Sequence, residues 1–599
     1  MTLRGIALAA LLLTFGIAPL TAAEEKPAKK EKKSDKPIVA HLVLKGDLDE
    51  SPSGESPFGG SSESLRQKLE RIQKAKNDPK VKALLIEIED LNLGLFGFGK
   101  VEEVRQAILD FRKSGKKAYV FTEGIGGIEY LIALAADTLC IPESGEFALL
   151  GLRIEMSFYK EAFDKFGIKA DFLTMGEAKG AAEPYTRTSM SPENRKQYDL
   201  VLDDLYEKGI IGTMISSRPE KKWTPEQLKK IIDAAPYSAK KSLALGLIDK
   251  IAYKDAFEEF IIKEASAEEI VENYGKPKSQ IDDNPLAAIM KLMSPTKKAS
   301  SKKPKIAVIY AVGGIESGVG GPGIMGGNSV GSKTLIDAIK QAEEDDTVKA
   351  IVLRVDSPGG SALASDLIWH ALKKSKKPTI ASMGDVAASG GYYISMGCSK
   401  VYAEPGTLTG SIGVVGGKIT LGGVYDWVGV KTETLSRGAN GGINSINKIF
   451  SDSERKAVTE LMQEIYDQFL DRTLQNRTAN GVKLTKESLL PLAGGRIWTG
   501  RQLKERGLVD ELGTLSDAIA EAKKRAKLES DPELLILPEP VSILDKLMEK
   551  GFGMNLSQSS LKQLEMIPEM KGHLRNIEGL LRLQKDRVWL TMPYGVKVK

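Results

Sequence analysis

Short runs of Val, Ile and Leu alternate along the chain with longer amphipathic stretches. Residues 81–88 and 348–355 follow polar turns and are apolar at nearly every position, which is typical of strands buried on both faces. Apolar residues recur at helical spacing over 64–75, 101–114 and 333–344. This alternation predicts an α/β fold with mostly parallel sheets and crossover helices, and it disfavours a pair of helical bundles.

The pattern occurs twice, at a separation of about 265 residues. The segment NDPKVKALLIEIED around Lys82 resembles EDDTVKAIVLRVDS around Lys349. Two further pairs keep nearly the same separation, namely 129–142 with 392–405 and 244–251 with 505–512. The sequence therefore predicts two similar α/β domains, at 38–274 and 304–538.

The remaining segments differ in composition from these two domains. Residues 24–37 form a charged linker that contains proline, and 275–303 form a second linker. Beyond the second domain, 539–599 contains short Met-rich amphipathic stretches, which predict a helical C-terminal extension that packs on the body or on a partner.

Residues 1–23 have the features of an export signal. Arg4 precedes an uncharged apolar run, and Thr21-Ala22-Ala23 provides small residues for a signal peptidase. Gly16 and Pro19 interrupt the second half of the run, which favours cleavage over a retained membrane anchor. Either outcome places the body outside the cytoplasm, and a retained anchor would attach it to the membrane.

The amino-acid composition limits the kinds of functional site that the chain could have. The chain has 42% hydrophobic and 28% charged residues with a net charge of +5, which argues against nucleic-acid binding by bulk charge. Three His and two Cys leave little for a metal site, so no metal or cofactor is expected. Cys140 and Cys398 are expected to be buried free thiols, with a disulfide as the alternative. The candidate catalytic residues are therefore Ser, Lys, Asp and Glu.

The two copies differ where chemistry is expected. The second copy has Ser389 within AASGGYY, whereas the first has Gly126 at the corresponding position. The second copy also has a glycine pair in DSPGG (356–360), which its counterpart DLNLG (90–94) lacks. Conversely, the first copy has Lys179 within GEAKGAAEP, and the matching second-copy stretch has no lysine. One half offers a serine and the other a lysine.

This reciprocal difference suits a serine nucleophile activated by a lysine base. A hydroxyl needs a general base within hydrogen-bond reach, and a lysine amine becomes one when burial lowers its pKa. Backbone amides of Gly359, Gly360 and Gly390 could then hold the developing oxyanion, because glycine permits close approach of a substrate carbonyl. Packing roles for Ser389 and Lys179 remain the alternative.

At these residues the sequence resembles the signal peptide peptidase A family, also called protease IV, in its long tandem-domain form. The motifs that carry the resemblance are VDSPGG (355–360), MGDVAASGGYYIS (383–395), PGTLTGSIGV (405–414), AKGAAEPYTRTSMS (178–191) and WTGRQLKERGLVDELG (498–513). The resemblance implies Ser389 as nucleophile, Lys179 as general base and Ser411 as the residue that orients the lysine. It implies oxyanion amides at Gly359 or Gly360 and at Gly390.

The resemblance also implies a ClpP/crotonase-like spiral fold and a homo-oligomer, a tetramer in long forms. The implied activity is a serine endopeptidase that cleaves leftover signal peptides and other short or unfolded chains. The implied location is the periplasm, or the periplasmic face of the inner membrane, of a bacterium.

Two other functions stay open at the level of sequence. A crotonase-like acyl-CoA enzyme would need an adenine-binding loop and normally a cytoplasmic location, which the export signal disfavours. The second is an exported, non-catalytic crotonase-like scaffold. The motif G-x-G-x-x-G at 318–323 contains Pro322 and does not open a helix, so it does not indicate dinucleotide binding.

Overall fold

The computed structural model describes residues 36–50, 63–93, 96–276, 301–321, 329–539, 588–592 and 597–598. The described residues from Pro37 onwards belong to one compact unit. The predicted signal segment, most of both linkers and the Met-rich stretches of the tail lie outside the described residues. Among the described residues, no helix has the length and apolarity needed to cross a membrane.

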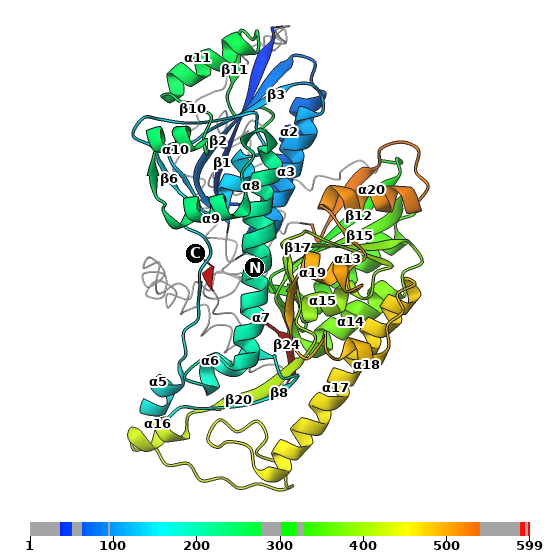
Figure 1. Cartoon of the computed structure of the whole chain (residues 1–599). Helices are drawn as coiled ribbons and strands as arrows, with labels where there is room; N and C mark the ends of the chain where they lie inside the picture. The colour runs from blue at the N-terminus through cyan, green and yellow to red at the C-terminus, as the bar shows by residue number, and fades with distance from the viewer. Residues whose placement is uncertain are drawn as a thin grey trace, which may run out of the picture. The chain divides into compact units, whose positions relative to one another are not determined.

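The N-terminal half contains a six-stranded parallel sheet in the order β10-β5-β3-β2-β1-β11. Its strands are β1 (Ile38–Asp47), β2 (Val81–Asn92), β3 (Lys117–Phe121), β5 (Thr138–Ile141), β10 (Lys250–Ile251) and β11 (Glu269–Val271). Helices α2 (Leu65–Asn77) and α3 (Phe98–Arg112) connect the first three strands, as the periodicity predicts (Figure 1).

The C-terminal half repeats this arrangement with β12, β15, β17 and β18 in place of β1, β2, β3 and β5. The strands are β12 (Lys305–Val312), β15 (Val348–Ser357), β17 (Thr379–Ala388), β18 (Lys400–Ala403), β19 (Leu408–Gly410), β21 (Ile497–Thr499), β22 (Glu511–Leu512) and β23 (Glu533–Leu537). Its main helices are α13 (Ser332–Glu344), α14 (Ala362–Lys373), α15 (Gly390–Ser395), α17 (Asp452–Ala479) and α20 (Leu515–Arg525). The predicted duplication of an α/β unit is confirmed.

The central strands are buried on both faces, which explains their nearly continuous apolar sequence. Along β12, Ala307 and Ile309 belong to one core cluster, and the alternate residues Ile306 and Val308 belong to another. Successive side chains of a strand point to opposite faces, so each face of the sheet has its own core. Cys140 and Cys398 lie in these cores as free, buried thiols, as expected.

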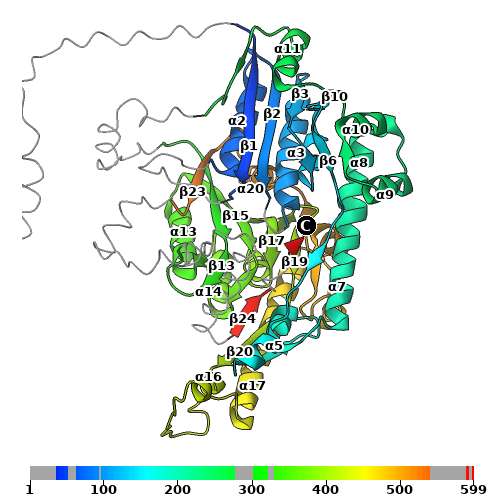
Figure 2. The ribbon, with the colours of Figure 1, turned by 90° about the vertical axis from the view of Figure 1, so that its left-hand side faces the viewer.

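A third sheet joins the two halves and places the candidate site. Its order is β14-β13-β16-β24-β20-β8, from β13 (Gly314–Glu316), β14 (Ser329–Gly331), β16 (Gly359–Ser361), β24 (Val588–Thr591), β20 (Val414–Thr420) and β8 (Lys169–Met175). The strand β8 from the first half pairs antiparallel with β20 from the second over seven residues. Figure 1 shows these two strands side by side, and both views show β24 near β20 (Figures 1 and 2).

The described part of the tail is extended rather than helical. Its two strands are β24 and β25 (Lys597–Val598), and β25 pairs with β7 (Ile154–Glu155).

Candidate active site

Ser389 lies on a tight turn between a buried strand and a helix. β17 ends at Ala388, α15 begins at Gly390, and Ser389 between them has φ 54° and ψ −111°. A non-glycine residue with this backbone is strained, and such strain is typical of functional sites. The turn is held because the Ser389 amide donates to Gly410 O at 2.8 Å and the Tyr393 amide donates to Ser389 O at 2.8 Å.

Lys179 reaches Ser389 from the other half of the chain. It follows β8 and is only 3% exposed, and its Nζ lies 2.7 Å from Ser389 Oγ. The same Nζ lies 3.0 Å from Ser411 Oγ and 3.0 Å from Ser411 O. The structure thus brings together the three side chains that the sequence singled out, across 210 and 232 positions.

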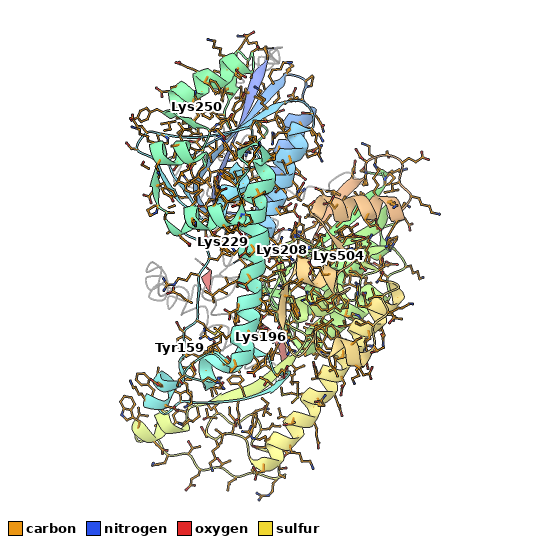
Figure 3. The ribbon with its side chains drawn as sticks, viewed as in Figure 1. Tyr159, Lys196, Lys208, Lys229, Lys250 and Lys504 are labelled. Atoms are coloured by element: carbon orange, nitrogen blue, oxygen red, sulfur yellow. The ribbon has the colours of Figure 1, made fainter. Side chains whose placement is uncertain are left out.

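Burial lowers the pKa of the Lys179 amine well below its usual value of 10.5. Desolvation is the cause, because burial disfavours the ammonium form. Burial distinguishes Lys179 from lysines such as Lys196 and Lys208, labelled in Figure 3, whose side chains are exposed. A neutral amine in contact with a serine hydroxyl can accept its proton.

Ser411 also lies on a strained turn. It directly follows β19, has φ 51°, and its amide donates to Arg496 O at 2.7 Å. Its side chain is buried with those of Ser389 and Lys179.

Three glycines surround Ser389. Gly359 and Gly360 open β16 with φ values of +99° and +157°. A Cβ on Gly390 would lie 3.0 Å from Gly359 Cα and 3.2 Å from Gly360 N, so the glycines are in close contact. The amide of Gly359 donates to Ser357 Oγ at 3.1 Å, which leaves Gly360 and Gly390 as the better candidates for holding an oxyanion.

The segment that contains Gly494 and Gly495 holds Lys179 in place, and it was not predicted from the sequence. The Ala178 amide donates to Gly494 O at 2.9 Å, and the Gly495 amide donates to Ile412 O at 2.7 Å. A Cβ on Gly495 would lie 2.6 Å from Lys179 Cα. The segment therefore lies between the lysine loop and the Ser411 turn. The signal available in the sequence was its glycine pair, close to the WTGRQ motif.

Gln197 on α7 (Pro192–Asp203) was also missed. Its Nε2 donates to Ala178 O at 3.0 Å, and its Oε1 accepts from the Ile497 amide at 2.8 Å. It connects the lysine loop to β21 of the other half. Its side chain is one of many polar ones on a helix, so no sequence signal distinguished it.

Other sequence features lie apart from these residues. Gly126, the counterpart of Ser389, ends the short strand β4 (Ile125–Gly126). His370 is exposed on α14. The described part of the 318–323 motif follows β13 and precedes β14, so a strand rather than a helix comes next. Within the described ranges, no group of three or more His, Cys, Asp or Glu side chains could hold a metal ion.

Comparison with known proteins places this geometry in context. The sequence profile of peptidase family S49 matches the chain twice, at residues 110–267 and 371–529. A chloroplastic serine protease, SPPA, from Arabidopsis thaliana is 32% identical over 93% of this chain and 80% of its own length. Protease 4 from Salmonella typhi is 30% identical over 87% of this chain and 81% of its own length. Among solved structures, the 1510-N membrane-bound stomatin-specific protease is 18% identical, with a TM-score of 0.26, over 41% of this chain and 97% of that one.

Proposed function

The chain belongs to peptidase family S49 and is a serine protease with two S49 domains, and from this premise we propose that Ser389 and Lys179 form its catalytic dyad. The observation that carries the proposal is the 2.7 Å contact between Lys179 Nζ and Ser389 Oγ, made by a buried amine with a lowered pKa. A surface lysine, charged at neutral pH, could not act as a base there.

The hydrogen bonds of Lys179 suit a general base. A neutral amine has two N–H groups and one lone pair. If the N–H groups donate to Ser411 O and Ser411 Oγ, both at 3.0 Å, the lone pair is left for the Ser389 hydroxyl. Ser411 then acts as a positioning residue for the base.

The reaction follows from this arrangement. Ser389 Oγ attacks the scissile carbonyl while its proton passes to Lys179. The amides of Gly390 and Gly360 stabilise the oxyanion, and the Lys179 ammonium returns the proton to the leaving amine. Water, deprotonated by the same lysine, then hydrolyses the acyl-enzyme. Since the oxyanion amides and the nucleophile come from the second half and the base from the first, each half alone is inactive.

We propose cleaved signal peptides and other short or unfolded chains as the substrates. Such chains are extended, and an extended peptide could take the position between β16 and β20 that the strand β24 occupies in the structure. The proposal further includes domains at 38–274 and 304–538, export to the periplasm or its membrane face, and assembly into a homo-oligomer, a tetramer.

A fluorophosphonate probe tests the dyad directly. Such a probe acylates activated serines, so the folded protein should be labelled at Ser389, and Ser389→Ala should not be labelled. Absence of labelling in protein with a normal melting curve would refute the proposed nucleophile.

Replacement of Ser411 by alanine should slow the enzyme without abolishing catalysis. Orientation and general-base effects are worth about 10²–10⁴-fold, and the loss of one orienting hydroxyl should fall at the lower end of that range in kcat. The measurement is steady-state kinetics on an apolar reporter peptide, with KM nearly unchanged. Unaltered kinetics would remove Ser411 from the site.

Activity should rise with pH and persist in alkaline solution. The base works only as the neutral amine, so kcat/KM increases as pH passes through the lowered pKa of Lys179. A pH–rate profile between pH 5 and 10 measures this. A profile with a maximum near pH 5 that falls by pH 8 would contradict a lysine base.

A further inference from the structure

A strand from the far C-terminus lies between the two edges of the proposed active site. β24 (Val588–Thr591) pairs antiparallel with β16, which carries Gly359 and Gly360. On its other side β24 pairs antiparallel with β20. Without β24, the edges of β16 and β20 would face each other across a gap one strand wide, as in sites that bind a peptide by strand addition.

The backbone of this strand approaches the proposed oxyanion amides. A Cβ placed on Gly359 would lie 2.0 Å from Leu590 O and 2.6 Å from Gly390 N, so the tail carbonyl lies beside the Gly390 amide. The Met592 amide extends the contact by donating to Pro358 O at 3.1 Å. Glycine at position 359 is therefore what allows a strand to come so close.

The side chains of the strand fill apolar sites on alternate faces. Val588 and Leu590 belong to the same buried cluster as Ile315 of β13, the strand next to β16, and Val330 of β14, the strand beyond it. Trp589 belongs instead to a cluster with Val415 and Ala182, three residues after the catalytic lysine. This is how a groove with pockets on both faces would hold an extended peptide.

The fit of the strand is incomplete. Among the described residues, the buried Nε1 of Trp589 has no hydrogen-bond partner, although buried polar groups in stable cores are nearly always paired. The ladder with β16 covers three residues and that with β20 two. Apolar burial of so short a segment is largely offset by the entropy lost on ordering it, so a peptide in solution can compete with it.

We propose that Val588–Met592 is an intramolecular pseudosubstrate: it occupies the position of the substrate strand and inhibits the intact chain until a peptide displaces it. The proposal rests on the proposed function of Ser389 and Lys179. Because the segment belongs to the same chain, it competes at an effective concentration that does not fall when the protein is diluted.

Removal of residues 588–599 tests the proposal. The shortened chain should have a kcat/KM for an apolar reporter peptide about 10–100-fold higher than the intact chain, through a lower KM, because the tethered competitor is gone. Fluorophosphonate labelling of Ser389 should accelerate as well. Mass spectrometry before the assay establishes that the intact chain still carries its tail.

A point variant provides a second test if the shortened chain does not fold. Leu590→Asp places a charge in an apolar site and should release the strand, with activation similar to that of the deletion. Its emission spectrum should shift to the red as Trp589 becomes exposed. Leu435→Asp is the matched control, since Leu435 is 95% exposed and lies outside the site.

A synthetic peptide of residues 584–599 completes the test. Added to the shortened chain, it should inhibit competitively, and the same peptide with aspartate at position 590 should not. Unchanged or lower activity in both tail variants, with normal labelling of Ser389, would overturn the pseudosubstrate and leave the dyad intact. Absence of labelling in every variant would instead refute the dyad.

Discussion

Replacement of Lys179 by methionine should abolish peptide hydrolysis while leaving a folded protein. Methionine keeps the length of the side chain but cannot accept a proton from Ser389. Loss of a catalytic base that acts as a unit with its nucleophile costs about 10⁴-fold or more in kcat. The measurement is hydrolysis of an apolar reporter peptide, together with the thermal melting of the same samples.

The difference in stability between the native protein and Lys179→Met should depend on pH in a defined direction. Burial lowers the pKa of Lys179 well below 10.5, so between that lowered pKa and 10.5 the unfolded native chain binds a proton that the folded chain does not. The native protein is therefore destabilised as pH falls from 10.5 towards the lowered pKa, and the variant is not. Lost hydrogen bonds to Ser411 offset part of this gain, so we expect stabilities within about 1 kcal/mol at pH 7.

Two control variants distinguish the loss of the catalytic base in Lys179→Met from a loss of activity through unrelated structural effects. Lys196→Met changes an exposed lysine and should leave both activity and stability nearly unaltered. His370→Ala removes the one histidine within residues 304–538, which include Ser389, and it should retain most of the activity because His370 is exposed on α14. Substantial activity in a well-folded Lys179→Met protein would disprove the split dyad.

Local patterns of apolar residues were sufficient to predict the two α/β units of this molecule. Strands such as β12 and β15 are buried on both faces, so burial alone forces a run of apolar residues that is visible in the sequence. The duplication made the site visible too. Ser389 and Lys179 stand out because the counterpart of each, in the other copy, lacks its functional group.

The parts that could not be predicted depend on contacts between distant segments. Gly495 lies against Lys179 only because the loop before β21 folds onto the loop after β8. Gln197 bridges two backbone segments about 300 residues apart, and nothing in its local sequence marks that role. The tail strand β24 lies beyond the Met-rich stretches that predict a helical extension, and it forms by pairing with β16 and β20, which its local sequence does not reveal.

The second large predicted effect is on folding stability, and it concerns a buried ion network between the two halves. Arg354 on β15 is 0% exposed, and its guanidinium lies 2.5 Å from Glu50 and 3.0 Å from Glu103, both in the first half. Glu404 of the second half lies 3.7 Å away. Three carboxyl groups thus surround one cation, and burial raises the pKa values of Glu103 and Glu404, the latter strongly.

Arg354→Met should destabilise the protein by about 3–5 kcal/mol, because it leaves the carboxyl groups of Glu50, Glu103 and Glu404 buried without a counter-ion. Denaturant unfolding monitored by circular dichroism measures the loss. Activity should fall with it, since the network ties the first half, which provides Lys179, to β15, which leads into the glycine pair at 359–360.

Glu404→Gln is the matched control within the same network. Its raised pKa means that the folded state prefers the neutral acid, so native stability falls as pH rises above 4.5, the usual value for this group. A neutral amide of the same shape avoids that penalty, and we expect Glu404→Gln to be as stable as the native protein or more stable at pH 7. If Arg354→Met and Glu404→Gln destabilised the protein equally, the network would act through packing alone. A stable Arg354→Met protein would show that the carboxyl groups are held neutral and that the cation does not bind the two halves together.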